Sequence, residues 1–477
     1  MPRLKYASVA RVVVILGLFC LWLQIMLSAS SGGLYRDAEN ITLTSEINVE
    51  SRGLIQIYEE ELMNANDTSE QVLALVPPEL HKYLTVHPKN STANSTEKIS
   101  YKNITDIKRA IQRCNDAQLI YNEDIFGPVQ NDTIIIAIQV HTRLTYLRHL
   151  IVSLAQAKEI DRTLLIFSHD YYDEEINALV RSIDFTKVMQ IFYPYSIQTH
   201  PNEFPGMDPN DCPRDTKFEQ AVKLKCNNAL YPDLHGHYRE AKYTQTKHHW
   251  WWKANRIFNQ LQCTAGHTGM VVFLEEDHYV AEDFIHMLGL LKSTADKSCP
   301  QCEILSLGTY LKTYQYHVNS DKVEITPWHS SMHNMGFAFN RTVWSNILEL
   351  QDQFCAYDDY NWDYSLLHLS QNRPGRDKFK VILCKGPRVF HIGECGIHHK
   401  KSNCNASTVI SKVQKLLVNA KPYMFPTRVS ATVTAGGAKH NKKLVKGNGG
   451  WGDIRDQELC ANMTRIGRQT RINIYYA

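Results

Sequence analysis

The sequence has little net charge, because 52 lysine and arginine residues nearly balance 49 aspartate and glutamate residues and leave +3 over 477 residues. A protein that binds nucleic acid usually carries a basic patch or stripe, so this balance gives no reason to expect a nucleic-acid partner. The sequence also lacks the His-Glu-x-x-His helix of zinc proteases, the Gly-x-Ser-x-Gly turn of serine hydrolases and the phosphate loop ending in Gly-Lys-Ser/Thr. Three common enzyme classes therefore find no support.

Long apolar runs are scarce too. The run from Val12 to Leu27, with its neighbours, approaches the ~20 residues that span a bilayer, and no later run does. Basic residues before it predict a cytoplasmic N-terminus. We therefore expect a cytoplasmic tail over residues 1–11, a signal-anchor helix over 12–30 and a lumenal remainder. A cleaved signal peptide is the alternative, because Ser28 to Ser30 looks like a small-residue cleavage site, but the length of the run favours an anchor.

Asn-x-Ser/Thr sequons and cysteines both suit the secretory pathway. Sequons accept N-glycans at the surface of secreted chains, and the nine here begin at Asn40, Asn66, Asn90, Asn94, Asn103, Asn131, Asn340, Asn405 and Asn462. Cys20 lies in the apolar run, which leaves eleven of the twelve cysteines on the lumenal side. Several should pair in an oxidising compartment, and an odd number leaves at least one free or intermolecular.

The lumenal part divides by composition. Residues 31–120 predict a stem, because five of the nine sequons and clusters of Ser, Thr and Asn fall there. Their apolar patches are short, so local helices are possible but a core is not expected. Residues 121–477 predict a catalytic domain, and we find no internal repeat.

From Asn131 onward, strand-like and helix-like patterns alternate. The pattern predicts a doubly wound, Rossmann-like, mostly parallel sheet with helices on both faces. Ligands of such sheets bind at the carboxyl ends of the strands, so the residues there are the candidates. The expected strands are 133–140, 163–167, 187–192 and 269–274, and the expected helices are 144–157, 174–183 and 243–261.

The expected strand ending at Leu274 runs into Glu275-Glu276-Asp277-His278. Three acids at the end of a buried strand are costly unless they are solvated, paired or bound to a metal. Hard oxygen ligands suit Mn²⁺ or Mg²⁺. A solvated loop in which Asp277 caps a helix is an equally good interpretation of this tetrapeptide.

Two other strand ends fit the same place. Residues 139–143 close the first strand and open a helix, where backbone N–H groups and Arg143 suit a phosphate or a base. Asp170 follows the second strand and suits a base or a ribose. Taken alone, each position is more often a helix cap.

Three further segments carry candidate side chains. Residues 245–253 (QTKHHWWWK) place two His and two Lys around three Trp, although most of the Trp residues fit a helix core. Residues 356–364 (AYDDYNWDY) offer aromatic faces and carboxylates to a sugar, or else an N-cap by Asp358 or Asp359 before a helix. His391 follows a short apolar strand and suits a metal ligand, although a lone His there is more often structural.

Taken in order, these segments closely resemble the N-acetylglucosaminyltransferase II family. The resemblance covers most of residues 131–460, and neither the stem nor the extreme C-terminus shares it. The matching stretches are 139–143 (QVHTR), 166–170 (IFSHD), 201–205 (PNEFP), 211–215 (DCPRD), 237–242 (HYREAK), 245–253, 274–279, 305–310 (LSLGTY), 333–336 (HNMG), 357–363, 396–401 and 449–456 (GGWGDIRD).

The resemblance implies a GT-A-type glycosyltransferase in the Golgi membrane, single-pass and type II. It implies inverting, metal-dependent transfer of GlcNAc from UDP-GlcNAc to the 2-hydroxyl of the α1,6-arm mannose of N-glycans on glycoproteins. Carried over by position, Asp277 and His391 would hold Mn²⁺, and Asp363 would be the general base. Asn334 and Trp362 would recognise the acceptor. The nucleotide sugar would contact Gln139, Val140, His141, Thr142, Arg143, Asp170, Gln245, Thr246, Lys247, His248 and His249.

The family pattern also implies four disulfides: Cys212–Cys226, Cys299–Cys302, Cys355–Cys460 and Cys395–Cys404. Leu350 and Arg373 occupy the positions of a further family bridge, so that bridge is absent here. Cys114, Cys263 and Cys384 have no implied partner.

Two other functions are weighed against the enzyme. A glycan-binding protein could keep this fold without catalysis, but the intact Asp277, His391 and Asp363 argue against it. A structural or adhesion protein at the cell surface would not require the acid-aromatic cluster at 356–364.

Overall fold

The structure is a computed structural model that describes residues 72–85, 103–393, 406–434 and 446–476. The expected tail and anchor, and most of the expected stem, lie outside the described residues, as does the Cys395–Cys404 bridge. Among the residues described, no helix combines the length and the apolar character that crossing a bilayer requires.

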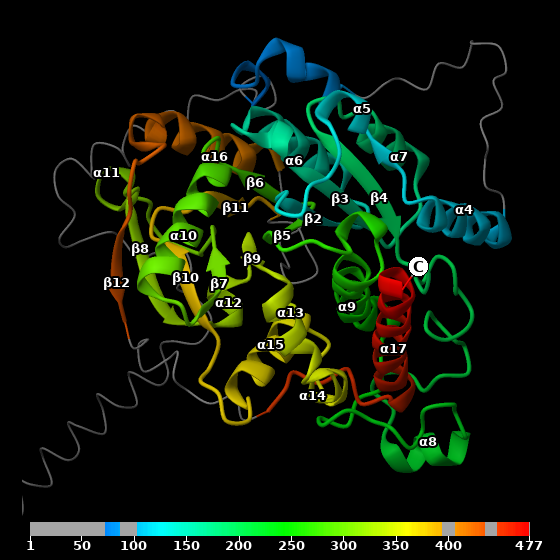
Figure 1. The fold of residues 1–477 in the computed structure, drawn as a ribbon. Coiled ribbons are helices and arrows are strands. Elements are labelled where there is room, and N and C mark those ends of the chain that lie inside the picture. The colour runs from blue at the N-terminus through cyan, green and yellow to red at the C-terminus, as the bar shows by residue number, and fades with distance from the viewer. Residues whose placement is uncertain (1–71, 86–102, 394–405, 435–445, 477) are drawn as a thin grey trace, which may run out of the picture. The chain divides into compact units, whose positions relative to one another are not determined.

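A ten-stranded sheet forms the centre of the protein, in the order β1-β4-β3-β2-β5-β9-β7-β10-β8-β12 (Figure 1). The neighbours β4, β3, β2 and β5 are all parallel, as the alternating sequence pattern predicts. The antiparallel β9 then lies between β5 and β7. The strands are β1 Ile120–Tyr121, β2 Ile135–Val140, β3 Leu164–His169, β4 Lys187–Phe192, β5 Val271–Glu275, β7 Cys302–Ser306, β8 Lys322–Pro327, β9 Phe337–Phe339, β10 Lys380–Cys384 and β12 Ser430–Val433.

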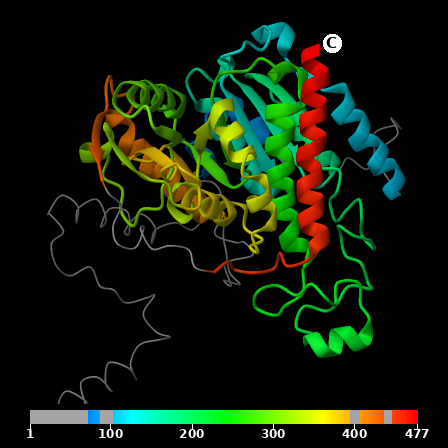
Figure 2. The ribbon, with the colours of Figure 1, turned by 60° about the horizontal axis from the view of Figure 1, so that its bottom comes forward.

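Helices cover both faces of the sheet because its central strands are apolar on both sides. Along β2, Ile136 and Ile138 pack into one core, whereas Ile135 and Ala137 pack into another. The first core includes α6 Leu144–Gln156, α7 Glu174–Arg181 and α10 Phe284–Ser298. The second includes α9 Ala241–Asn259, α13 Arg341–Leu348, α14 Gln351–Ala356, α15 Trp362–Gln371 and the start of α17 Ile454–Tyr476, which runs beside α9 (Figure 2).

A separate two-stranded sheet joins β6 His278–Val280 to β11 Val389–His391. In its antiparallel register, His391 lies opposite His278. A fully buried ion pair holds the other end of this sheet, where Arg388 Nη2 lies 3.0 Å from Asp283 Oδ2. This sheet therefore fixes His391 beside the turn that follows β5.

The structure corrects the expected boundary of the stem. Val76 and Tyr83 belong to the first core, and Tyr83 also donates a hydrogen bond to Asp184. Helix α4 Ile104–Ala117 is held by Asn115, which pairs with the backbone of Phe192 in both directions. Residues 72–85 and 104–117 are therefore part of the folded body rather than of a stem.

The remaining described elements are short, apart from α16. They are η1 Pro78–Tyr83, α5 Glu123–Phe126, η2 Ile160–Arg162, α8 Phe218–Leu224, η3 Gln262–Thr264, α11 Tyr316–Asn319, α12 Ser330–His333, α16 Ala406–Ala420 and η4 Lys421–Tyr423.

Three of the four implied disulfides are present: Cys212–Cys226, Cys299–Cys302 and Cys355–Cys460. Cys114, Cys263 and Cys384 are free. At the position of the missing family bridge, Arg373 instead forms a two-bond ion pair with Glu303, with Nη2 2.7 Å from Oε1. A bidentate pair of this kind ties the segment after α15 to β7 without a covalent link.

Candidate active site

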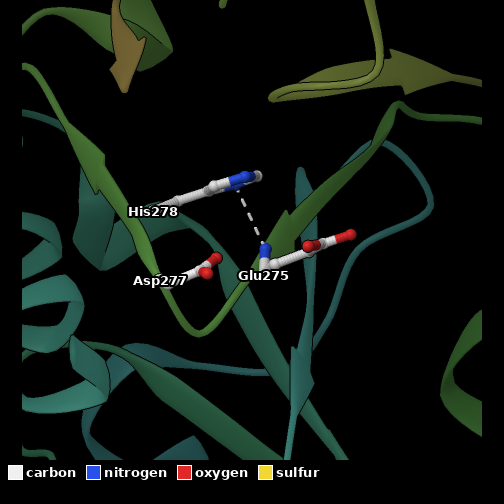
Figure 3. Close-up of side chains that lie close together, drawn as sticks. All are labelled: Glu275, Asp277 and His278. Carbon is white, nitrogen blue, oxygen red and sulfur yellow. Dashed lines mark hydrogen bonds between the residues drawn. The ribbon is translucent and has the colours of Figure 1, made fainter. Parts of the chain in front are cut away.

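The turn between β5 and β6 gathers the acidic residues that the sequence singled out. Figure 3 shows Glu275, Asp277 and His278 close together on this turn, and their possible ligand atoms lie within 4.8 Å of one another. The backbone N–H of Glu275 donates to His278 Nδ1 at 3.1 Å. Burial lowers the pKa of His278 to about 4, so its ring is neutral at physiological pH. The imidazole is thus locked in one orientation by the turn itself.

Asp277 and His391 are in direct contact, since Asp277 Oδ2 lies 3.3 Å from His391 Nε2. Burial tends to raise the pKa of Asp277, but the hydrogen bond and charge of His391 outweigh it and lower the pKa to about 2. Arg143 also donates to Oδ2, whereas the buried Oδ1 has no hydrogen-bond partner within the described chain. An ionised carboxylate with one uncommitted oxygen beside an imidazole is a donor set that suits a divalent cation.

Gly393 allows the chain after β11 to pass over this carboxylate. A Cβ at this position would collide with Asp277 and with the Arg143 guanidinium. Any larger residue at 393 would therefore displace either Asp277, the candidate metal ligand, or the backbone at position 393 itself.

A second group of side chains surrounds Asp170 at the end of β3. Asp170 Oδ1 lies 2.6 Å from His141 Nδ1, and Asp170 Oδ2 accepts from Gln245 Nε2 at 2.9 Å. Burial tends to raise the pKa of Asp170, but hydrogen bonds from His141 and His249 lower it well below its usual range. Asp170 is thus a fixed negative charge at the carboxyl edge of the sheet.

Glu276 holds the turn after β2 against this edge. Its Oε2 accepts from the backbone N–H groups of His141 at 2.8 Å and Arg143 at 3.3 Å. Burial raises the pKa of Glu276 to about 7. The turn of residues 139–143 is therefore shaped by the same acidic segment that carries Asp277.

Asp363, in the first turn of α15, forms the third group. Asp363 Oδ2 accepts from Asn334 Nδ2 at 3.2 Å, and Oδ1 accepts from the backbone N–H of Tyr364 at 2.9 Å. Burial raises the pKa of Asp363 to about 7, with further contributions from the charges of Asp359 and Glu275. This carboxyl group is poised to exchange a proton near neutral pH.

Tyr310 connects the metal candidates with Asp363. Burial raises the pKa of its hydroxyl, and the charges of Glu275, Asp277 and Asp363 raise it further. Its ring centroid also lies 6.3 Å from that of His391. The acids from β5, its following turn and α15 thus act on one phenol, which places them around a common region.

Comparison with known proteins identifies the family of the chain. The family model described as N-acetylglucosaminyltransferase II matches residues 108–460. The chain belongs to this family. It is 45% identical over 359 residues to the alpha-1,6-mannosyl-glycoprotein 2-beta-N-acetylglucosaminyltransferase of Rattus norvegicus, covering 75% of this chain and 80% of that protein. The protein of the same name from Arabidopsis thaliana is 35% identical, covering 73% of this chain and 78% of that protein. The chain is therefore a glycosyltransferase.

Two solved structures align only weakly with this chain. Staphylococcus aureus TarS 1–349 aligns with a TM-score of 0.27 and 9% identity, covering 60% of this chain and 65% of that chain. Mycobacterium tuberculosis glucosyl-3-phosphoglycerate synthase, in complex with Mn²⁺, UDP-glucose and phosphoglyceric acid, aligns with a TM-score of 0.27 and 11% identity, covering 62% and 82%. Scores this low assign no role to any residue here.

Several residues implied by the resemblance have buried contacts of their own. Lys247 Nζ donates to the carbonyls of Tyr357 and Asp359, each at 3.0 Å, and His248 Nε2 lies 2.9 Å from Asp456. Both side chains thus secure α9 to neighbouring segments. Trp362 stacks on Trp250 and on Phe337, with ring centroids 4.7 Å and 5.5 Å apart, and is buried, so it offers little surface to an acceptor.

Lys253 was not singled out from the sequence as a site residue. Its Nζ donates to Gln139 Oε1 at 2.8 Å, and burial lowers its pKa to about 7. Gln245, His249 and Lys253 recur at intervals of four, which puts them on one face of α9. From the sequence, this spacing of four would place Gln245, His249 and Lys253 on a different face of the helix from Lys247 and His248.

Proposed function

We propose that the chain transfers GlcNAc from UDP-GlcNAc to the 2-hydroxyl of the α1,6-arm mannose of N-glycans on glycoproteins. The observation that carries this proposal is the direct contact of Asp277 with His391 in a member of this family. The names of the sequence relatives support the same donor sugar and acceptor arm. Such transfer leads to complex N-glycans.

Asp277 and His391 are the residues that would hold a divalent cation, with Mn²⁺ as the proposed ion. The uncommitted Asp277 Oδ1 and the nearby imidazole fit such an ion. A cation bound there supplies positive charge against the diphosphate of the departing UDP. In its absence, Arg143 provides the countercharge to Asp277.

The nucleotide sugar would lie against the carboxyl ends of β2 and β3. Asp170 offers a fixed acceptor for N–H or O–H groups of the uridine, held in place by Gln245 and His141. Helix α6 begins directly after this turn, and helix N-termini commonly form phosphate sites. These groups bind and orient the donor.

Asp363 would act as the general base. Its carboxylate takes the proton from the acceptor hydroxyl while that oxygen attacks the anomeric carbon from the face opposite UDP. One displacement inverts the anomeric centre, so no covalent sugar-enzyme intermediate forms. A pKa near 7 suits this role, because the carboxylate is both available and basic near neutral pH.

The proposal includes a place in the cell. A GT-A-type catalytic domain in the Golgi lumen, held by a single type II anchor over residues 12–30, accounts for the apolar run and the nine sequons. Protease protection in sealed membranes tests this topology: the folded body should be protected until detergent is added. Digestion without detergent would contradict it.

Product analysis tests the proposed reaction. The enzyme is incubated with UDP-GlcNAc and mannose-terminated N-glycans that differ in which arm is free, and products are identified by mass spectrometry and linkage analysis. We expect one GlcNAc added β1,2 to the α1,6-arm mannose. Transfer to another hydroxyl or to no glycan would overturn the proposal.

A further inference from the structure

A crevice opens at the end of the sheet opposite the candidate active site. It has a volume of about 220 Å³ and lies where β5 and β7 begin, between the end of α10 and the start of α13. Residues that line it include Lys292 and Asp296 of α10, Cys299 and Cys302, and Thr342 and Asn346 of α13. Pockets for drug-sized ligands are usually about 300–1,000 Å³, so this crevice suits a smaller group.

One of the nine sequons stands at the rim of this crevice. Asn340 and Thr342 of the Asn340-Arg341-Thr342 sequon both line it. Asn340 is the N-cap of α13, and its Oδ1 accepts from the backbone N–H of Val343 at 3.2 Å. Its amide nitrogen Nδ2, the atom that carries an N-glycan, has no hydrogen bond to the described residues, and Thr342 is exposed.

The lining suits a sugar with an acetamido group. Lys292 and Asp296 form an exposed ion pair at 2.6 Å that can donate to and accept from hydroxyls. Asn346 adds an amide, while Met270 and Pro300 add apolar surface for a methyl group or a ring face. A lining that combines polar groups with apolar atoms can contact both the hydroxyls and the ring face of a pyranose.

We infer that Asn340 carries an N-glycan and that the first GlcNAc of this glycan lies in the crevice. Capping and glycosylation are compatible, because the cap uses Oδ1 and the sugar is attached to Nδ2. The inference rests on the lumenal location in the proposed function, since N-glycans are added to chains inside the secretory pathway. The seated sugar joins α10 to α13 at this end of the sheet and so stabilises the folded body.

Site occupancy is the first test. The full chain is produced in a cell that performs N-glycosylation, deglycosylated by an amidase in ¹⁸O-labelled water, and analysed as peptides. Attachment at Asn340 leaves an ¹⁸O-labelled aspartate at that position, as expected. Occupancy at other sequons with none at Asn340 would overturn this inference alone. If no sequon is occupied, the proposed lumenal location fails as well.

Thermal unfolding tests whether the sugar is seated. The full chain, made with oligomannose glycans, is trimmed by an endoglycosidase that leaves one GlcNAc on each site. It is compared with Asn340→Asp, which retains the cap but not the sugar, and with Thr342→Ala, which retains Asn340. We expect both variants to unfold at least ~2 °C lower than the trimmed wild type. The matched control is Asn103→Asp, because Asn103 is an exposed sequon that caps α4 and is expected to show no shift. Equal unfolding temperatures for the wild type and both Asn340 sequon variants would overturn the seating.

Discussion

Asn334 donates a hydrogen bond to Asp363 across 3.2 Å, from the C-cap of α12 to the first turn of α15. Asn334 was expected to recognise the acceptor, and this contact gives it a second task. By donating to Oδ2, it stabilises the ionised form of Asp363 and fixes the direction of the carboxylate. The carboxylate of the base is thereby held in one orientation.

The pH dependence of transfer follows from the raised pKa of Asp363. The base works only when deprotonated, so log kcat/KM should rise with pH up to about 7 and then level off. The measurement is kcat/KM for the acceptor from pH 5 to 9 at saturating UDP-GlcNAc. A rate that stays flat between pH 5 and 7 would count against Asp363 as the base.

Substituting Asn334→Ala should shift the acidic limb of the profile, the part in which log kcat/KM rises with pH, to higher pH. Loss of a hydrogen bond to a carboxylate costs about 1.5 kcal/mol, which corresponds to roughly one pH unit. The affinity for UDP-GlcNAc should be unchanged, because Asn334 contacts the base rather than the Asp170 group. If the Asn334→Ala variant binds the acceptor more weakly but keeps the wild-type pH profile, Asn334 recognises the acceptor and does not tune Asp363.

Asp363→Asn removes the proton acceptor while nearly preserving its shape. We expect kcat to fall by about 10²–10⁴-fold, in the range that general bases contribute. UDP-GlcNAc should bind as before in calorimetry. Tyr364→Phe is the control, because its backbone N–H, rather than its hydroxyl, contacts Asp363. A kcat within threefold of wild type in Asp363→Asn would require another base.

The Arg388–Asp283 pair should be a large source of stability, because both side chains are fully buried. Arg388→Met leaves the buried Asp283 carboxylate without its charged partner, although the backbone N–H of Phe425 still donates to it. We expect the free energy of unfolding to fall by about 3–5 kcal/mol. Adding Asp283→Leu should recover much of that loss. The control is Arg162→Met, which removes an exposed pair with Glu159 and should cost less than about 1 kcal/mol. Denaturant unfolding measures all four proteins, and equal losses for Arg388→Met and Arg162→Met would contradict the role of burial.

The parallel half of the sheet could be predicted from the sequence because each strand is an apolar run on its own. Strand β4 was expected at its observed bounds, and β2, β3 and β5 within a few residues. The pairing of β11 with β6 could not be predicted, since it joins His391 to His278 across the intervening chain. Nothing local to residues 389–391 indicates that partner, and only the family resemblance linked His391 to Asp277.

The polar residues of α9 show a different limit. The three consecutive Trp residues are all buried, so they define no single apolar stripe and give no guide to which polar residues face the site. The structure assigns Gln245 and His249 to Asp170 and turns Lys247 and His248 elsewhere. The prediction that residues 72–85 belong to a stem was wrong for a related reason. Val76 and Tyr83 pack against apolar residues of elements that are distant in the chain.

We propose above that Asp277 and His391 hold one divalent cation next to the donor diphosphate. The most direct measurement is anomalous X-ray scattering from crystals of the enzyme grown with Mn²⁺ and UDP. We expect a manganese peak coordinated by Asp277 Oδ1 or Oδ2 and by His391 Nε2, with Arg143 displaced from Asp277. A manganese peak that lies elsewhere, with Arg143 still paired to Asp277, would contradict it.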